Sequence, residues 1–589
     1  MKQHIFLALL LFSAFSFSQT TIKGTVTDNN NFPLPGASIL VKGTTKGEIT
    51  DIDGKFDLSL DKTPATLVVS YLGFKTKEIV VDKQTTLNIR LEEDTATLNE
   101  VVIIGYGQVN KGDVTGSVTK IKPKEDALAQ VQSVEALIQG RAAGVTVSAN
   151  SFEPGATTSI KIRGLNSLTG NTEPLYVIDG IIVDSATEDV LDPLQGGNSS
   201  LSAQNGITGV NPRDIASVEI LKDASATAIY GSRGANGVVI ITTKTGKKGN
   251  AKFNYTTTSR LGNVVNEIDV LDTRDYINYF NDVQANNGFS PRFYVYPDGS
   301  FAEFSNNEQF MIDNADTIPR LEGVDWSDDT YKGSVTTTHR LTASGGSDTG
   351  DYYFGLGYVK NEGVVPNAFT KSVDLNIKLN NQLNDKLKLS TKISAFYGDF
   401  SASKGTEDLG GNNNNLVRQI ISGAPILNLS ANFFGLQDDF TENLDGPRAW
   451  ITDYDDLSTE IRLLGSLGLN YKLSDIFTYD LRVGTDYRNK ERKVWYGTSI
   501  FRGANVNGEA GIANLSRFRY NIDNTLRFRK RFNKNHNING TVGVIVDQRF
   551  SKQVANTGSG FAVKDLRADG IGNAQVTQPT VLLRENESL

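Results

Sequence analysis

Long stretches of the second half of the chain alternate apolar and polar residues with a period of two. Between Ser372 and Leu379 the odd positions are apolar and the even positions are polar. Successive side chains of a β-strand point to opposite faces, so this pattern predicts strands with one apolar and one polar face. The same alternation runs through residues 386–397, 463–473, 477–483 and 517–532.

The length of these strands narrows the choice of architecture. They run to about ten residues or more, whereas strands of globular proteins usually have about five or six and membrane barrel strands need roughly 9–11. Short turns at 380–385, 474–475 and 533–537 alternate with long connections such as 399–457. This is typical of a transmembrane barrel, with short turns at one end and long loops at the other. A soluble β-sandwich is the alternative, with shorter strands expected.

The first part of the chain has a different pattern of apolar and polar residues. Residues 19–92 contain short strand candidates separated by turn residues, which predicts a small β-sandwich. Residues 93–117 read as a linker that starts acidic, ends rich in glycine and contains the apolar run Val101–Ile104. An extended segment of this kind can pair with a partner's sheet edge. The alternative is an ordinary first strand of the next domain.

Residues 118–248 predict a compact α+β unit. Residues 133–140 suggest a short helix that ends at a glycine, and Pro174–Ile178 a buried strand closed by an Asp-Gly turn. A second buried run, Val238–Ile241, follows glycines at 231, 234 and 237, which allow tight turns and close backbone approach.

The N-terminus has the features of a secretory signal peptide. Lys2 precedes the apolar stretch Ile5–Phe17, which is short for a membrane span. Small residues at 16 and 18 predict cleavage between Ser18 and Gln19. The alternative is a buried N-terminal strand or helix. We therefore expect an exported protein with a signal peptide at 1–18.

Composition argues against several kinds of site. The chain has no cysteine, three histidines and a net charge of −8. We therefore expect no disulfide, no cofactor and no metal site, and the dispersed basic residues do not predict nucleic-acid binding. A secreted enzyme is a further alternative, but the sequence offers no nucleophile–base pair, so no catalytic residue is predicted.

Four strings in order carry a family resemblance: ALIQGRAAGVTV, SIKIRGLNSL, PLYVIDGIIVD and VEILKDASATAIYGSRGANGVVIITTK. Together they resemble the plug domain of the SusC/RagA family of TonB-dependent outer-membrane transporters. The stretch GTVTDNNNFPLPGASILVKGTTKG resembles the carboxypeptidase regulatory-like domain found in front of such plugs. The positions of the plug motif are Arg141, Arg163, Gly164, Asp179, Gly180, Tyr230, Gly231, Arg233, Gly234 and Gly237.

The resemblance implies a mostly β fold: the regulatory-like sandwich, an α+β plug at 118–248, and an antiparallel transmembrane barrel from 249–589. The run LNEVVIIGYG is similar to the family's TonB box, which implies a strand for the TonB partner at Glu100, Val101, Val102, Ile103 and Ile104. Barrels of this kind have about 22 strands, and 249–589 suffices for roughly a dozen. We therefore expect the chain to be an N-terminal part of a longer protein.

The resemblance also implies a function: nutrient import across the outer membrane of a Gram-negative bacterium. TonB with ExbB and ExbD would supply energy, a SusD-like lipoprotein would assist, and the cargo would be an oligosaccharide or a peptide. The alternatives are a receptor for siderophore or vitamin uptake, a surface protein for adhesion or signalling, or a non-functional truncated fragment.

Two sets of residues are given roles on this basis. Arg141, Arg163 and Arg233 are expected to anchor the plug to the barrel by ion pairs, and contact with the substrate is the alternative. The tryptophans are expected either to stack on sugars or to lie in the aromatic belt at the membrane interface; they are Trp326, Trp450 and Trp495.

Overall fold

In the computed structural model the chain forms two compact units. The first comprises Met1–Val102 and Gly107–Thr115, and the second Ile103–Tyr106 and Gly116–Leu589. The structure describes residues 20–92 (except 30, 45, 61, 72–73 and 83), 101–104, 107–110, 116–124, 128, 131, 133–149, 153–156, 158–165, 172–183, 189–190, 192–194, 207–265, 268–305, 307–403, 416–427, 446–532, 536–578 and 581–588. The predicted signal peptide and its cleavage site at Ser18 and Gln19 lie outside this set.

The first unit is the predicted sandwich. One sheet has the order β4-β1-β7 and the other the order β3-β2-β5-β6. Strand burial alternates, as in β4, so each sheet turns one apolar face inward. The side chains of Ile22, Val26, Ile39 and Val69 are fully buried in the core. The strands are β1 (Thr20–Thr27), β2 (Ser38–Val41), β3 (Gly47–Ile49), β4 (Lys55–Leu60), β5 (Ala65–Ser70), β6 (Lys77–Val81) and β7 (Thr86–Arg90).

The second unit begins with an α+β body that we call the plug body. Its sheet has the order β10-β15-β16-β13-β14, with a separate β11-β12 hairpin and helix α3 beside it. The Ser133 hydroxyl accepts a hydrogen bond from Ala136 N–H and caps α3. The elements are β10 (Val118–Ile121), α3 (Val134–Ile138), β11 (Val145–Ala149), β12 (Thr158–Ile162), β13 (Leu175–Ile178), β14 (Ile181–Val183), η3 (Pro212–Asp214), β15 (Ile215–Leu221), α4 (Ala224–Thr227), η4 (Ala228–Gly234) and β16 (Val238–Thr243).

The Asp-Gly turn between β13 and β14 sets a charged side chain at the edge of the plug body. Asp179 and Gly180 have φ values of 48° and 88°, the left-handed pair that a tight hairpin turn requires. Gly237 has φ 88°, and a Cβ there would lie 2.6 Å from Ile162 Cδ1. The glycine therefore meets both a backbone requirement and a packing requirement where β16 begins.

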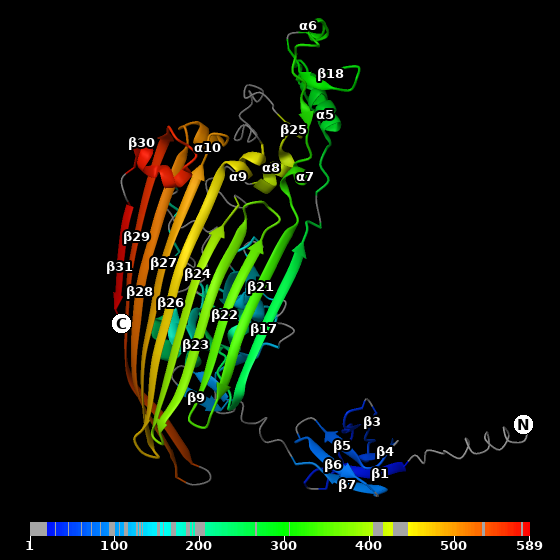
Figure 1. Cartoon of the computed structure of the whole chain (residues 1–589), viewed down its shortest axis with the longest axis vertical. Helices are drawn as coiled ribbons and strands as arrows, with labels where there is room; N and C mark the ends of the chain where they lie inside the picture. The colour runs from blue at the N-terminus through cyan, green and yellow to red at the C-terminus, as the bar shows by residue number, and fades with distance from the viewer. Residues whose placement is uncertain are drawn as a thin grey trace, which may run out of the picture. The chain divides into compact units, whose positions relative to one another are not determined.

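The rest of the second unit is dominated by one antiparallel sheet. Its path is β17-β21-β22-β23-β24-β26-β27-β28-β29-β30, and β31 also pairs with β29. The long strands lie side by side in chain order in Figure 1, and helices α7 to α10 gather beyond one end. The long strands of this sheet are β17 (Gly249–Gly262), β21 (Ser334–Gly346), β22 (Gly350–Glu362), β23 (Phe369–Asn384), β24 (Leu387–Ser401), β26 (Tyr454–Lys472), β27 (Phe477–Tyr496), β28 (Glu509–Arg531) and β29 (Asn537–Phe561).

These strands are longer than the alternation alone predicted. β28 has 23 residues and β29 has 25. The turn predicted at 380–385 is tighter, since β23 extends to Asn384 and β24 begins at Leu387. Likewise the connection predicted from 399 to 457 is shortened at both ends, because β24 extends to Ser401 and β26 begins at Tyr454. Backbone pairing between neighbouring strands continues past the point where the side-chain pattern weakens.

The two faces of the large sheet have inverted polarity. One register row across the sheet is apolar and is exposed or half-buried: it joins Tyr255, Leu341, Leu356, Leu375, Ala395, Leu463, Tyr487, Phe518 and Phe550. Leu463 in this row is 47% exposed. The next row faces the plug body and is largely polar: Arg340, Gly357, Asp374, Phe396, Arg462, Arg488, Arg517 and Ser551. Arg462 in this row is 3% exposed. Apolar outside and charged inside is the polarity of a barrel wall in lipid.

The arrangement of apolar residues outside and polar residues inside ends near one end of the sheet. On β28 the inward side chains change from Arg517 to Leu515 and Ala513, while the outward ones change from Phe518 to Ser516 and Asn514. One part of β28 therefore has an apolar outward face suited to lipid. The part toward the long connections has a polar outward face suited to water.

The connection between β17 and β21 forms two small cores. Ile277 and Phe293 form one together with Ile426, which comes from the connection between β24 and β26, and Tyr296, Ala302 and Met311 form the other. No helix among the described residues is both long and apolar enough to cross a membrane. The remaining elements are α5 (Thr273–Asn286), β18 (Phe293–Val295), β19 (Phe301–Glu303), α6 (Glu308–Asp313), β20 (Glu322–Gly323), α7 (Trp326–Thr330), α8 (Leu416–Ser422), β25 (Ile426–Leu427), α9 (Arg448–Thr452), α10 (Phe501–Ala504), η6 (Arg567–Asn573), β30 (Ala574–Thr577) and β31 (Val581–Ser588).

Candidate functional site: the contact between plug and sheet

Buried ion pairs join the plug body to the inward face of the large sheet. Arg233, in η4, pairs with Asp547 of β29, and Arg519 of β28 pairs with the same carboxylate at 2.8 Å. Asp547 and Arg519 are 3% and 4% exposed. This contact matches the anchoring role expected for Arg233.

The Asp-Gly turn supplies a second anchor. Asp179 lies 3.2 Å from Lys378 Nζ on β23 and 2.7 Å from Lys392 Nζ on β24. It also accepts hydrogen bonds from Thr243 N–H and Oγ1 at 2.9 and 2.6 Å. Burial by itself raises the pKa of Asp179, but Lys392 and Lys378 outweigh it and hold the pKa below its usual range. Asp179 therefore stays ionised between two lysines of the sheet.

The third anchor depends on glycines in β22. Asp214, at the end of η3, pairs with Arg340 of β21, which also pairs with Asp374 of β23. Tyr353 donates to Asp214 at 2.7 Å. A Cβ at position 357 would overlap Asp374, and one at 355 would overlap the guanidinium. The alternating glycines of β22 therefore leave the space that the buried Arg340 side chain occupies.

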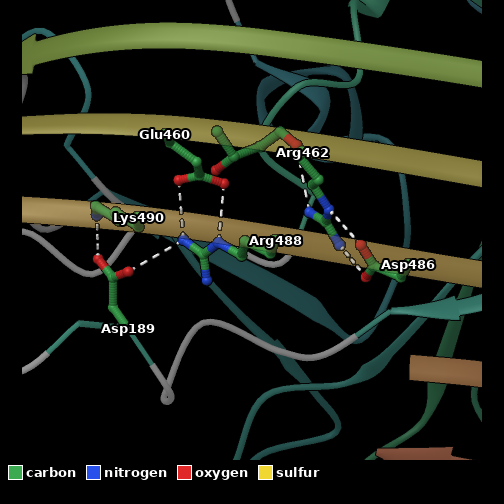
Figure 2. A network of polar contacts seen from close by, with 7 residues as sticks. Asp189, Glu460, Arg462, Asp486, Arg488 and Lys490 are labelled. Carbon is green, nitrogen blue, oxygen red and sulfur yellow. Dashed lines mark hydrogen bonds and ion pairs between the residues drawn. The ribbon is translucent and has the colours of Figure 1, made fainter. Parts of the chain in front are cut away.

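The fourth anchor involves the plug segment 189–194, in its described residues 189–190 and 192–194. Figure 2 shows Asp189 between Arg488 and Lys490 of β27, with contacts of 3.0 and 2.5 Å. Arg488 also makes a two-pronged contact with Glu460 of β26, at 2.8 and 3.0 Å. Further along β27, Arg492 reaches Asp192 at 3.4 Å. Burial raises the pKa of Asp189, but Lys490 and then Arg488 outweigh it, so the pKa lies below its usual range.

Close backbone packing accompanies this anchor. A Cβ at Gly511 of β28 would lie 2.7 Å from Pro193 Cβ and 3.0 Å from Leu194 Cγ. Val190 packs with Ala513 and Leu515 of the same strand. Segment 189–194 thus fits the apolar part of the inward face while its carboxylates reach the charged part.

The other motif residues lie within the plug body. Arg163, with φ 59°, pairs with Asp223 of the plug and not with the sheet. Arg141 has no side-chain ion pair with any residue that the structure describes. Tyr230 is 6% exposed in the plug core. Gly164, Gly231 and Gly234 lie in turns or in η4. Of the three arginines expected to anchor the plug, the structure therefore joins Arg233 to the sheet.

The tryptophans have neither of the two expected roles. Trp326 is 5% exposed and donates to Ala424 O at 2.7 Å. Trp450 is 5% exposed and donates to Gln419 Oε1 at 2.9 Å. Trp495 is 1% exposed against Phe561. They stabilise the loops beyond the sheet, because burying an indole whose N–H is satisfied stabilises a loop core.

The backbone of the predicted TonB strand is extended. Val101–Ile104 forms β8, which pairs with β9 (Gly107–Asn110) in a two-stranded sheet. Glu100 lies outside the described residues. The described residues contain no group of three or more acidic or histidine side chains placed to hold a metal ion.

Sequence reasoning missed Asp189, Asp192 and Asp214 as anchors. Asp214 follows Asn211-Pro212, which signals a turn but not a partner. The available signal was on the sheet side, where Arg488, Lys490 and Arg492 recur at every second position of β27. Three like charges on one inward face require anions opposite them, and the plug supplies two.

The plug body is held by ion pairs on the polar inward face of an antiparallel sheet whose outward face is apolar. This arrangement is that of outer-membrane barrel proteins with a plug domain. Residues 22–103 match the CarboxypepD_reg-like domain, and residues 110–238 match the TonB-dependent receptor plug domain. The chain is 30% identical to TonB-dependent receptor P3 of Formosa agariphila over all of its own length and 54% of that protein. It is 38% identical to TonB-dependent receptor SusC of Bacteroides thetaiotaomicron over 376 residues, 63% of this chain and 33% of that protein.

Among solved structures, the RagAB peptide importer in its open-open state has a similar fold. Its TM-score is 0.62 at 20% identity, over 83% of this chain and 53% of that chain. The chain belongs to the SusC/RagA family of TonB-dependent receptors. It spans about half the length of the curated full-length relatives, P3 and TonB-dependent receptor P26 of the same organism.

Proposed function

We propose that this chain provides the plug and the first part of the barrel of a TonB-dependent importer in the outer membrane of a Gram-negative bacterium. The observation that carries the proposal is the docking of the plug body by buried ion pairs on the inward face of the sheet. A plug held mainly by discrete charge contacts, with apolar contacts limited to residues such as Leu464, Ala513 and Leu515 of the wall, can be released without unfolding the wall. Such release opens a path through the barrel.

Energy enters, in this proposal, through residues 100–104. An extended segment pairs with a partner strand by backbone hydrogen bonds, so a pull on it is transmitted along the chain to β10 and the plug sheet. TonB, driven by ExbB and ExbD, is the proposed partner. A SusD-like lipoprotein is the proposed companion at the outer surface, and an oligosaccharide or peptide is the proposed nutrient.

The test is removal of Val101–Ile104 from the protein in its native outer membrane. We expect energised uptake to be lost, while cargo binding at the cell surface and the amount of folded protein stay unchanged. A matched control removes four linker residues at 93–96. A surface adhesion or signalling role predicts no effect of either deletion on function, and that result would contradict import.

A further inference from the structure

The basic residues of β27 form a row that we call the cation ladder: Arg488, Lys490 and Arg492. They occupy alternate positions, so all three point to the inward face, about 7 Å apart from one to the next. Their exposures are 5%, 0% and 3%. The ladder lies in the half of β27 that leads to the long connections, near the point where the outward face of the neighbouring strand turns from apolar to polar.

The three cations differ in where their anions come from. Arg488 keeps Glu460, and Arg492 keeps Asp456 at 2.8 and 2.7 Å, both on the neighbouring strand β26. Lys490, in contrast, has its acidic partner among the described residues in Asp189 of the plug. The wall by itself therefore carries three cations against two carboxylates at this place.

Movement of segment 189–194 away from β27 removes the ion-pair partner of Lys490, and its cross-strand neighbour Glu460 is already bound by Arg488. Losing the partner of a charge is strongly unfavourable for as long as the rest of the plug keeps water away from it. The contact is thus stable either with Asp189 in place or with another anion in its position. The neighbours Val190, Pro193 and Leu194 pack against β28, and Arg502 donates a hydrogen bond to the Leu194 carbonyl at 3.4 Å.

We propose that the cation ladder is a binding subsite for carboxylate groups of the cargo, which Asp189 and Asp192 of the plug occupy in the resting state. A cargo carboxylate exchanges with Asp189 on Lys490 and Arg488, so cargo binding and release of segment 189–194 become one event. This inference rests on the proposed import function and adds the chemical class of the cargo: an acidic oligomer. No bond is made or broken, and charge is conserved by exchange of one carboxylate for another.

The experiment measures binding to the protein in native outer-membrane vesicles, without energy. The probes are two matched pairs: a hexa-uronate against a neutral hexaglucan, and a glutamate-containing hexapeptide against its glutamine counterpart. We expect the acidic member of one pair to bind about tenfold more tightly than the neutral member, with the preference weakened by salt. Which pair shows the preference identifies the source of the carboxylate.

Single substitutions test whether the preference for acidic probes comes from the cation ladder. Lys490→Gln should reduce acidic binding about tenfold, whereas Lys493→Gln, on the outward face of the same strand, should leave it unchanged. Asp189→Asn removes the resting anion and should strengthen acidic binding several-fold. Each variant is first checked for the wild-type amount of heat-resistant folded protein.

The outcomes separate the two proposals. Equal binding of acidic and neutral probes, or an acidic preference that survives both Lys490→Gln and Asp189→Asn unchanged, overturns the ladder as a cargo subsite. Energised uptake of a neutral cargo would then still support import. An acidic preference that depends on Lys490, in a protein whose uptake is insensitive to the 101–104 deletion, supports the subsite and contradicts import. Should Lys490→Gln fail to fold, the Asp189→Asn result decides.

Discussion

At the scale of single residues, the charges between plug and sheet are buried pairs in which neither side tolerates the loss of its partner. Asp179 is the clearest case, because a single carboxylate faces both Lys378 and Lys392, which are 14% and 5% exposed. The value of such a pair lies less in net stability than in specificity of docking, since a displaced plug leaves charges unpaired.

Asp179→Asn is therefore expected to destabilise plug docking by about 3–5 kcal/mol, because the buried Lys392 and the half-buried Lys378 lose their anion. Urea titration of the folded protein, followed by protease access to the plug body, measures the change. The control is Asp348→Asn, which breaks an exposed pair with Lys248 and should not alter the midpoint. Equal midpoints for both variants would contradict the anchoring role.

The depressed pKa of Asp179 also predicts a direction with pH. A carboxylate whose pKa is lower in the folded state stabilises that state above its unfolded pKa of about 3.9, and the contribution is lost as pH falls below this value. We expect docking to weaken between neutral pH and pH 3, and the Asp179→Asn variant to show a shallower dependence. A variant as pH-sensitive as the wild type would assign the effect to other carboxylates, of which Asp189 is the next candidate.

At the scale of elements, β28 combines three environments along one strand: a lipid-type segment, a charged inward face and an apolar contact with segment 189–194. Gly511 marks that contact. Its neighbours leave no room for a side chain, although its backbone conformation suits any residue. The requirement is therefore steric.

Gly511→Ala is expected to displace Pro193 and Leu194, since overpacking at a tight contact costs about 1–3 kcal/mol. The Leu194 amide, which donates to Asp192 Oδ1 at 2.9 Å, should then exchange its hydrogen about 5- to 100-fold faster. Gly540→Ala on β29 is the matched control, because nothing lies within 4 Å of a Cβ there. Unchanged exchange at Leu194 would show that the segment does not rely on this contact.

The sequence predicted the elements better than the contacts between them. Alternation between Ser372 and Leu379 predicted both the strand and the faces, because a period of two is a local property. The partners of Asp214 and Asp189 lie more than a hundred residues away, and strand register decides them. Arg233 was assigned by resemblance, and the same resemblance did not distinguish it from Arg163, whose partner lies in the plug.

At the scale of the whole molecule, the exposed apolar row and the buried charged row of the large sheet imply lipid on one side and plug on the other. In water the exposed row would be an extensive apolar surface, which soluble monomers avoid. The change to polar outward residues beyond Phe518 sets a limit to the lipid-facing band.

This arrangement predicts that the stability cost of an outward-facing charge depends on its position along the strand. Leu463→Arg, in the apolar row, should lower the stability of the membrane-inserted form by about 2–4 kcal/mol. Asn514→Arg, outward but beyond the band, should have little effect. Unfolding from lipid vesicles measures both, and equal effects would contradict a lipid-facing role for the row.

The small cores of the segment between β17 and β21 have a consequence for how such a protein diversifies. Ile277 and Met311 pack among neighbours that contribute nothing to the interlocked charges beneath the plug. Descendants can exchange this outer segment together with its packing partner β25, whereas a charge on β27 changes only together with its counterpart on the plug. Sequence differences should therefore accumulate first in this outer segment, while the ionic contacts between plug and sheet persist across lineages.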